Sequence, residues 1–487
     1  MKRAGLNAVL SVALATSVGV GITSARPASL SHYVGRAADL WVAGAVQHDS
    51  PERMRELEEA RGVVARNKEK VRKNPDDAQA HKALGDAYLF LEEYENAFAS
   101  YKEVIRLTPN DAEAHRGTGE VYERVWQTAK ALDFYRKAVR LDPRLARAQT
   151  DLGKILVRLF QYKEAIGPLK EGIRLKPRGK VEHNDYLNLG EAYLQTGQYQ
   201  DAVGAYRQAL EVAPYYTSTH ASIAEAYNGM KQYEKAIASA VLVLKQTPYD
   251  QQANRVLGDA YAGMERYDKA VEYYKESIRV AANRYQVEAL LGLGLTYIRM
   301  AKHEEALAAF EKGIQYASTP RQFAVEDEIK PWLLPALHFA TIQADLNMGR
   351  GEAAAEAARK YIEIQTWSGP NAAYAALMAY FGNRKAGRDE EARKVLEEAS
   401  ARTDAKAWPA PVFQYLRGDL KEEGLLASAT DNDKMTEARA YAGMTLALAG
   451  RLDAARPHLE WVVKNGNREF VEYTLAQSEL RRITKGP

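Results

Sequence analysis

The residues of this chain that could hold a metal ion or transfer a proton are its nine histidines. His81, His115 and His220 occupy the same position in three copies of a repeated segment. Equivalent positions in neighbouring helical units lie about 10 Å apart, whereas the ligands of a zinc ion lie about 2.0–2.2 Å from it. We therefore interpret these histidines as structural residues at helix interfaces. Four others are isolated in the sequence and form no HExxH pattern: His183, His303, His338 and His458.

Other catalytic patterns are absent from the sequence. It has no phosphate-binding glycine loop and no GxSxG nucleophile turn. The absence of cysteine also excludes a thiol nucleophile, a disulfide, a thiolate metal site and covalently attached c-type haem. The sequence therefore predicts no enzyme activity, no cofactor and no metal. An active site within residues 320–435 is the alternative, and turnover by that region would reveal it.

A period of about 34 residues organises the chain between residues 78 and 318. Each copy has a small residue at one position: Gly85, Gly119, Gly153, Gly190, Ala224, Gly258 and Gly294. An alanine follows twelve residues after each of these: Ala97, Ala131, Ala165, Ala202, Ala236, Ala270 and Ala306. Small residues at these positions let two helices of one unit approach closely. Apolar residues between them recur every three or four positions, which predicts amphipathic helices.

Further residues keep the same register. A tyrosine three residues after the glycine recurs in six copies: Tyr88, Tyr122, Tyr193, Tyr227, Tyr261 and Tyr297. A bulky residue four after the alanine recurs in six: Tyr101, Tyr135, Leu169, Tyr206, Tyr274 and Phe310. Five copies end in a proline, which cannot continue a helix: Pro109, Pro143, Pro177, Pro214 and Pro248. In these features the chain resembles the tetratricopeptide repeat (TPR) family. The resemblance implies an all-α fold, a right-handed superhelix of helical hairpins with about seven regular and two or three degenerate repeats, and a concave binding surface lined by the first helix of each repeat.

The pattern divides the chain into five parts. Residues 1–25 are a signal peptide or membrane anchor, and 26–77 are an N-terminal extension with a capping helix. Residues 78–319 hold seven regular TPR units and 320–404 hold two degenerate units. Residues 405–487 form a last TPR-like unit and a capping helix, since solenoid ends need a polar outer face.

The N-terminus has the composition of an export signal. Lys2 and Arg3 precede an uncharged run from Ala4 to Ala25, in which small residues surround a candidate cleavage site. Glycine, serine, threonine and asparagine dilute this run, so a cleaved signal is favoured over a retained anchor. We expect the protein to be periplasmic or secreted, with membrane association through this segment as the alternative.

The C-terminal region shows a second resemblance. Trp408, Pro409 and Pro411, with Tyr415, Gly418, the stretch 437–463 and Phe470-Val471-Glu472, are similar to the tail of bacterial envelope TPR lipoproteins that scaffold peptidoglycan hydrolases. The chain departs from that family because it lacks the cysteine that carries the lipid. The resemblance therefore implies scaffolding in the envelope and puts lipid tethering in doubt.

The TPR resemblance implies that the first helices line the groove, chiefly through their second, fifth, ninth and twelfth positions when the glycine is counted as the eighth, and the candidate binding residues are read from the fifth and ninth. The candidates are Lys82, Asp86, Arg116, Glu120, Lys154, Glu191, Glu225, Arg255 and Asp259. Spacing predicts i,i+4 ion pairs Lys82–Asp86, Arg116–Glu120 and Arg255–Asp259. Two interpretations remain open: the charges only solvate the groove, or Glu191 and Glu225, which lack such a local partner, form an acidic lining for a basic or extended segment.

These observations predict a non-catalytic scaffold or adaptor that binds other proteins or peptide segments in the bacterial cell envelope. The net charge of +3 and the absence of a basic block exclude a nucleic-acid footprint. The alternative is a structural subunit that is permanently assembled into a larger membrane or extracytoplasmic complex.

Overall fold

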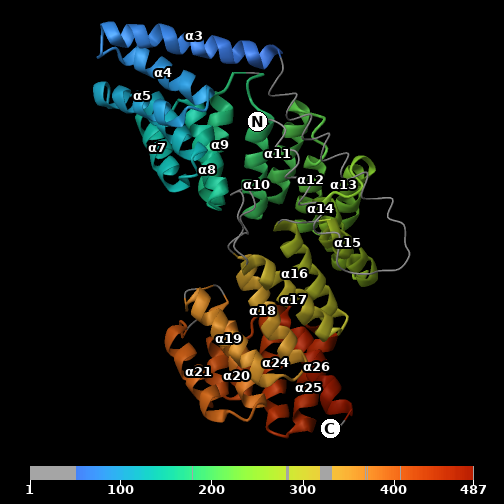
Figure 1. Cartoon of the computed structure of the whole chain (residues 1–487). Coiled ribbons are helices and arrows are strands. Elements are labelled where there is room, and N and C mark those ends of the chain that lie inside the picture. Colours follow the sequence, from blue (N-terminus) through green and yellow to red (C-terminus); the bar gives the residue numbers. More distant parts are fainter. Residues whose placement is uncertain are drawn as a thin grey trace, which may run out of the picture. The chain divides into compact units, whose positions relative to one another are not determined.

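The computed structural model describes residues 51–177, 179–280, 284–318, 332–367, 369, 371–405 and 407–485. These residues form 24 helices and no strand, and within each of the two units described below consecutive helices pack side by side (Figure 1). The expected all-α architecture is therefore confirmed. Among the described residues no helix is both long and apolar enough to cross a membrane. The predicted signal or anchor at 1–25 lies outside the described residues.

The chain separates into two compact units, one ending at Val125 and the other beginning at Trp126. The division falls between the two helices of the second repeat. The described residues of the first unit, from Pro51 onward, form four helices: α3 (Pro51–Lys73), α4 (Ala78–Phe90), α5 (Tyr94–Leu107) and α6 (Ala112–Arg124). Most side chains of α3 are exposed, and only Ala60 and Asn67 are buried, as expected for a polar end of the array.

The second unit continues the repeats and adds the C-terminal helices. Its repeat helices are α7 (Thr128–Leu141), α8 (Ala146–Arg158), α9 (Tyr162–Leu175), α10 (His183–Gln195), α11 (Tyr199–Val212), α12 (Thr219–Gly229), α13 (Tyr233–Gln246), α14 (Gln251–Gly263), α15 (Tyr267–Val280), α16 (Arg284–Arg299) and α17 (His303–Ser318). The C-terminal helices are α18 (Leu333–Asn347), α19 (Gly351–Gln365), α20 (Ala372–Lys385), α21 (Asp389–Arg402), α22 (Ala410–Arg417), α23 (Glu422–Ser428), α24 (Asn432–Leu448), α25 (Leu452–Asn465) and α26 (Val471–Lys485).

The repeat glycines make room for the bulky residue of the second helix. A Cβ added to Gly258 would lie 2.6 Å from the Tyr274 ring, and one added to Gly292 of the next repeat would also lie 2.6 Å from it. Tyr274 is therefore held between two glycines and is almost fully buried. Gly85 and Gly117 enclose Tyr101 in the same way. The period thus reflects close helix packing around buried rings.

This packing predicts opposite effects for two glycine-to-alanine substitutions. Gly258→Ala is expected to lower the free energy of unfolding by about 1–3 kcal/mol, because the new methyl group overlaps the Tyr274 ring. Gly204→Ala, inside α11 with no atom within 4 Å of the added Cβ, is expected to raise it by about 0.5–1 kcal/mol through higher helix propensity. Urea titration of both variants checks this. Equal effects of the two substitutions would contradict the packing role.

The C-terminal helix α26 returns to an earlier part of the second unit. It contacts α18, α24 and α25, and it contributes Leu475 and Ala476 to a core shared with helices from α18 onward. Gln343 donates a hydrogen bond to the Thr474 hydroxyl at 2.8 Å. Lys385 and Glu479, both 5% exposed, form a 2.6 Å ion pair. The side of α18 and α24 formed by first helices is therefore covered by α26.

Candidate functional site

The acids at the ninth repeat position accept hydrogen bonds from the buried tyrosines. The hydroxyls of Tyr101 and Tyr274 donate to Asp86 and Asp259 at 2.6 Å. Tyr206 donates to Glu191 at 3.4 Å. Burial raises the pKa of Tyr274 and the neighbouring Asp259 raises it further, so the phenol stays protonated and able to donate. A buried hydroxyl needs such an acceptor, and these acids therefore have a structural role in addition to any binding role.

In most other repeats, too, the residue at the ninth position depends on whether the bulky second-helix residue carries a hydroxyl. Where the second-helix residue has no hydroxyl, as at Leu169 and Phe310, the ninth position carries Lys154 and Leu295 instead of an acid. Glu225 is the exception, because its repeat has Ala240 at that place, and it uses an arginine from the next repeat. Much of the preference for acids at the ninth position is thus explained by their hydrogen bonds with buried tyrosines.

The basic candidates of the first three repeats are Lys82, Arg116 and Lys154. Each forms an ion pair, but Lys82 does not pair with the predicted residue. Arg116 pairs with Glu120 at 2.8 Å, as spacing predicts. The expected Lys82–Asp86 pair is wrong: the Lys82 ammonium lies 3.3 Å from Asp111 and 2.5 Å from Glu113, on the next first helix and its cap. Asp86 instead accepts from Tyr101. In the second unit Lys154 pairs with Asp185 of α10 at 3.3 Å.

Arg255 joins three consecutive first helices. Its guanidinium contacts Glu225 of α12 at 2.6 Å, Asp259 of α14 at 2.7 Å and Glu288 of α16 at 3.0 Å. The predicted Arg255–Asp259 pair is thus confirmed. Glu225, which has no i,i+4 partner in the sequence pattern, is paired with Arg255 of the next repeat. Three carboxylates around one guanidinium leave the cluster acidic.

This cluster borders a hollow of about 270 Å³ on the first-helix side of the second unit. Its wall includes Leu291, Leu295 and Trp332, and Trp332 is 48% exposed. A second hollow of about 510 Å³ shares Asp259, Gly292 and Leu295 with the first. We call the two together the groove. The smaller hollow combines acidic and apolar surface, and the larger one adds the basic side chains of Lys231, Arg299 and Arg468.

The C-terminal region forms one wall of the groove. Asn467, Arg468 and Glu469, which precede α26, line the larger hollow. Glu469 lies 2.7 Å from Lys231, and Arg468 lies 3.3 Å from Glu265. Lys231 and Glu265 occupy the same turn of successive repeats. Sequence analysis missed this contact, because nothing in the sequence links residues more than 200 positions apart.

Position two, which the TPR resemblance also places in the groove, supplies ion-pair and hydrogen-bond partners to the predicted residues. It supplies Glu113 to Lys82 and Glu288 to Arg255. Gln252 at the same position donates to Glu225 at 3.2 Å. Examination of this position beside the fifth and ninth would have indicated the links between repeats.

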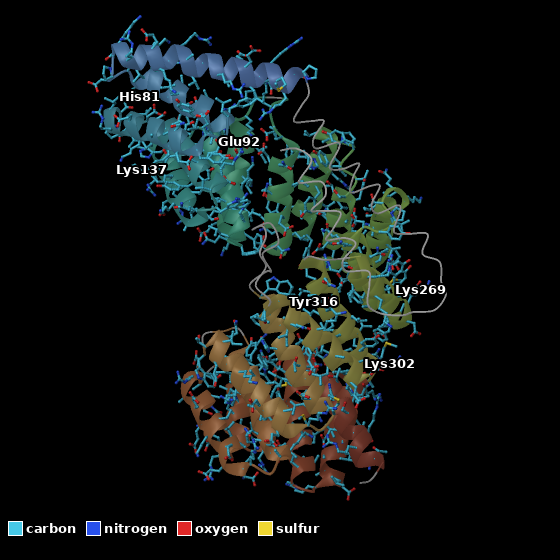
Figure 2. The ribbon with its side chains drawn as sticks, in the orientation of Figure 1. His81, Glu92, Lys137, Lys269, Lys302 and Tyr316 are labelled. Atoms are coloured by element: carbon cyan, nitrogen blue, oxygen red, sulfur yellow. The ribbon has the colours of Figure 1, made fainter. Side chains whose placement is uncertain are left out.

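Three of the histidines form hydrogen bonds with backbone carbonyls. The Nε2 of His81, which is labelled in Figure 2, donates to the Pro75 carbonyl at 2.9 Å, and His115 donates likewise to Pro109. Gln149 makes the equivalent bond to Pro143 at 2.8 Å. Nδ1 of His183 lies 2.8 Å from the Ala209 carbonyl of α11. Within the described ranges no group of three or more acidic, histidine or cysteine side chains could hold a metal.

Two buried carboxyl groups meet where α24 packs on α26. Glu437 accepts hydrogen bonds from Trp408 at 2.6 Å and Tyr374 at 3.3 Å, and Glu472 accepts from Tyr441 at 2.5 Å. Burial and the neighbouring Glu472 raise the pKa of Glu437 to about 8. Burial also raises the pKa of Glu472. The cluster holds the loop at Trp408 and the helices α20, α24 and α26 together.

Comparisons with known proteins agree with this geometry. Residues 85–125, 184–216 and 250–318 match family models described as TPR repeat or tetratricopeptide repeat. These three stretches are tetratricopeptide repeats within an all-α array of helices. Tetratricopeptide repeats mediate interactions between proteins. No curated protein matches the sequence.

Several solved TPR structures resemble parts of this solenoid. YrrB, described as a TPR protein with an unusual peptide-binding site, is 23% identical over 39% of this chain and 95% of its own, with a TM-score of 0.33. The pilF protein of Pseudomonas aeruginosa is 22% identical over 42% of this chain and 91% of its own, with a TM-score of 0.34. A TPR protein from Parabacteroides merdae is 14% identical over 53% of this chain and 98% of its own, with a TM-score of 0.41. These likenesses concern the fold of part of the chain.

Proposed function

We propose that this TPR solenoid is a non-catalytic scaffold or adaptor in the bacterial cell envelope and binds partner proteins along its first-helix surface. The observation that carries the proposal is the groove beside Arg255. It is open, it has apolar and aromatic walls, and its charged cluster holds three carboxylates against one guanidinium. Protein-binding sites commonly combine an apolar centre with such a polar rim.

The chemistry of the groove favours an extended segment with basic and apolar side chains. A basic side chain complements the excess carboxylate, and the exposed Trp332 ring can also accept a cation on its face. Leu291 and Leu295 offer apolar contact beside it. In this proposal Glu225, Arg255 and Asp259 contact the partner. The remaining candidates extend the surface along each unit: Lys82, Asp86, Arg116, Glu120, Lys154 and Glu191.

Recovery of partners from envelope extracts tests the function and the location together. The intact chain is expected to retain envelope proteins, identified by mass spectrometry after cross-linking. Leu295→Glu places a charge in the groove and is expected to lose them. Leu242→Glu, at an exposed site on the second helix α13, is the matched control and is expected to retain them. Recovery of cytoplasmic proteins alone would refute the proposed location.

A permanently assembled structural subunit is the second candidate. Tyr215 and Tyr249 lie one period apart in the turns after α11 and α13, and they are 76% and 52% exposed. Exposed aromatic rings are typical of protein interfaces. Native mass spectrometry of the purified chain distinguishes the candidates, because a scaffold with exchangeable partners is expected to be stable alone. Aggregation that only a co-purified partner prevents would favour the structural subunit.

A further inference from the structure

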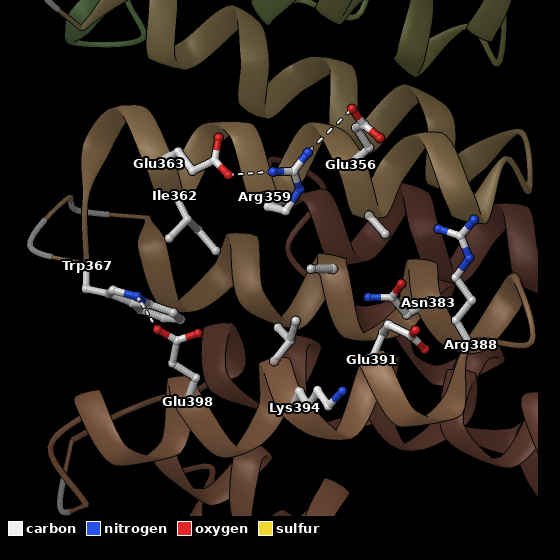
Figure 3. Close-up of a pocket in the computed structure, with 13 residues that line it drawn as sticks. Glu356, Arg359, Ile362, Glu363, Trp367, Asn383, Arg388, Glu391, Lys394 and Glu398 are labelled. Carbon is white, nitrogen blue, oxygen red and sulfur yellow. Dashed lines mark hydrogen bonds and ion pairs between the residues drawn. The ribbon is translucent and has the colours of Figure 1, made fainter.

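A third hollow, separate from the groove, lies among the C-terminal helices. Whereas the groove is formed by first helices, this hollow is formed by the second helices of two neighbouring hairpins. It has a volume of about 580 Å³ and is bordered by α19 and α21, with Ala379 and Asn383 of α20 at its floor (Figure 3). In this part of the second unit α26 covers the first-helix side, through contacts such as Lys385–Glu479. None of the residues that line this hollow lines the groove beside Arg255.

The floor of this hollow carries a polar group that protein atoms leave unsatisfied. Asn383 is only 7% exposed, and its side chain faces the hollow in Figure 3. Among the residues that the structure describes, none forms a hydrogen bond with its carboxamide. The carboxamide atoms open onto the hollow and are available to a ligand. A carboxamide offers one acceptor and two donors, which complement the N–H and C=O groups of a peptide backbone.

One end of the hollow is apolar and rigid. Trp367, Ile362 and Val395 border it, and Trp367 lies at the end opposite Arg388 in Figure 3. The indole Nε1 donates to Glu398 at 3.1 Å, and the Arg402 guanidinium lies 5.4 Å from the ring centre. These contacts fix the orientation of the ring. A fixed aromatic surface suits an apolar side chain, because little conformational entropy is lost on binding.

The other end carries one carboxylate without an internal counter-ion. Arg359 on the rim is already neutralised by Glu363 at 2.6 Å and Glu356 at 3.6 Å. Glu391 lies beside Asn383 in Figure 3 and is exposed, and within the described part of the chain it forms no ion pair. A basic side chain of a ligand would find its complement here.

We propose that this hollow binds an extended peptide segment of a partner protein. An apolar side chain of the segment packs on Trp367, its backbone amide pairs with the Asn383 carboxamide, and a basic side chain lies beside Glu391. The site is independent of the groove, so the solenoid can hold two partners on opposite faces of its repeats.

A positional-scanning library of blocked octapeptides, without terminal charges, tests the proposal with the full chain in a fluorescence anisotropy assay. The selected peptides are expected to combine a leucine, isoleucine or phenylalanine with a nearby lysine or arginine. Asn383→Leu is expected to weaken their binding about tenfold or more. It should leave the melting temperature nearly unchanged, because the carboxamide faces the hollow and forms no hydrogen bond with another described residue. The selection uses the full chain carrying Leu295→Glu, because the groove favours peptides of the same chemistry and this substitution blocks it.

A charge reversal provides a second, independent variant. Glu391→Lys is expected to shift the selected peptides from basic to acidic residues. Glu397→Lys makes the same change on the exposed surface of α21, outside the hollow, and should have no effect. The proposal is overturned if the chain selects no peptide, if selected peptides are indifferent to both Asn383→Leu and Glu391→Lys, or if Asn383→Leu lowers the melting temperature and leaves binding intact. Should Asn383→Leu fail to fold, Glu391→Lys decides.

Discussion

Replacement of Arg255 with methionine is expected to lower the free energy of unfolding of the second unit by about 3 kcal/mol at neutral pH. The guanidinium is the shared counter-ion of Glu225, Asp259 and Glu288, and its side chain is only 8% exposed. Without it, three carboxylates repel one another at the interface of three repeats. The loss is expected to shrink as the pH falls, because protonation of these acids removes the repulsion. Urea titrations at pH 7 and pH 4 measure both effects.

An exposed arginine provides the control for this substitution. Arg279→Met removes an ion pair with Glu276 in which the arginine side chain is 56% exposed. Exposed pairs contribute about 0–1 kcal/mol, so this variant should resemble the unmodified chain. Equal effects of Arg255→Met and Arg279→Met would contradict the role assigned to the Arg255 cluster.

The buried acids of the C-terminal helices are expected to make the second unit less stable as the pH rises. Glu437 has a pKa of about 8 in the folded protein and an ordinary value of 4.5. The folded state therefore binds the proton more tightly than the unfolded state does. The stabilisation is complete below about pH 4.5 and is lost as the pH rises to about 8. Linkage at about 1.4 kcal/mol per pH unit gives a loss on the order of 3–4 kcal/mol between pH 5 and pH 8.

Glu437→Gln isolates this effect. Glutamine keeps an acceptor oxygen for the Trp408 indole and cannot ionise, so the stability of this variant should depend less on pH and exceed that of the unmodified chain at pH 8. Glu397→Gln on the exposed surface of α21 should leave the pH profile unchanged. Urea titrations across this pH range provide the comparison. An unaltered pH profile in Glu437→Gln would show that Glu437 does not carry the dependence.

The fold could be predicted from sequence because the same residues for close helix packing recur, with small variations, in seven repeats. Gly258 and Tyr274 show the reason. The ring of the second helix needs a glycine opposite it on the first helix, so the spacing between these two residues is kept while other positions of the repeat vary. Helix α26 illustrates the opposite case. It packs against α18, α24 and α25. This contact occurs once in the chain, so no repeated sequence pattern indicates it.

The candidate site was only partly accessible to sequence reasoning. The TPR resemblance indicated Arg255 and Asp259, and their ion pair follows from helix geometry. The hydrogen bonds of Asp86 and Asp259 with buried tyrosines could also have been read from the sequence, because each acid precedes its tyrosine by fifteen residues, but the relation appears only when both helices of a repeat are compared. The hollow at Asn383 could not be predicted, because its polar group is conspicuous only once its burial and lack of a partner are known.

Site-specific cross-linking from the groove tests the central claim most directly. A photo-cross-linking amino acid at Leu295, which borders both hollows and is 39% exposed, should attach to a distinct set of envelope proteins in intact cells. The same group at Leu242, on the surface of α13, should not capture them. Cross-links from Leu242 to the same proteins, or none from Leu295, would contradict binding along the first-helix surface.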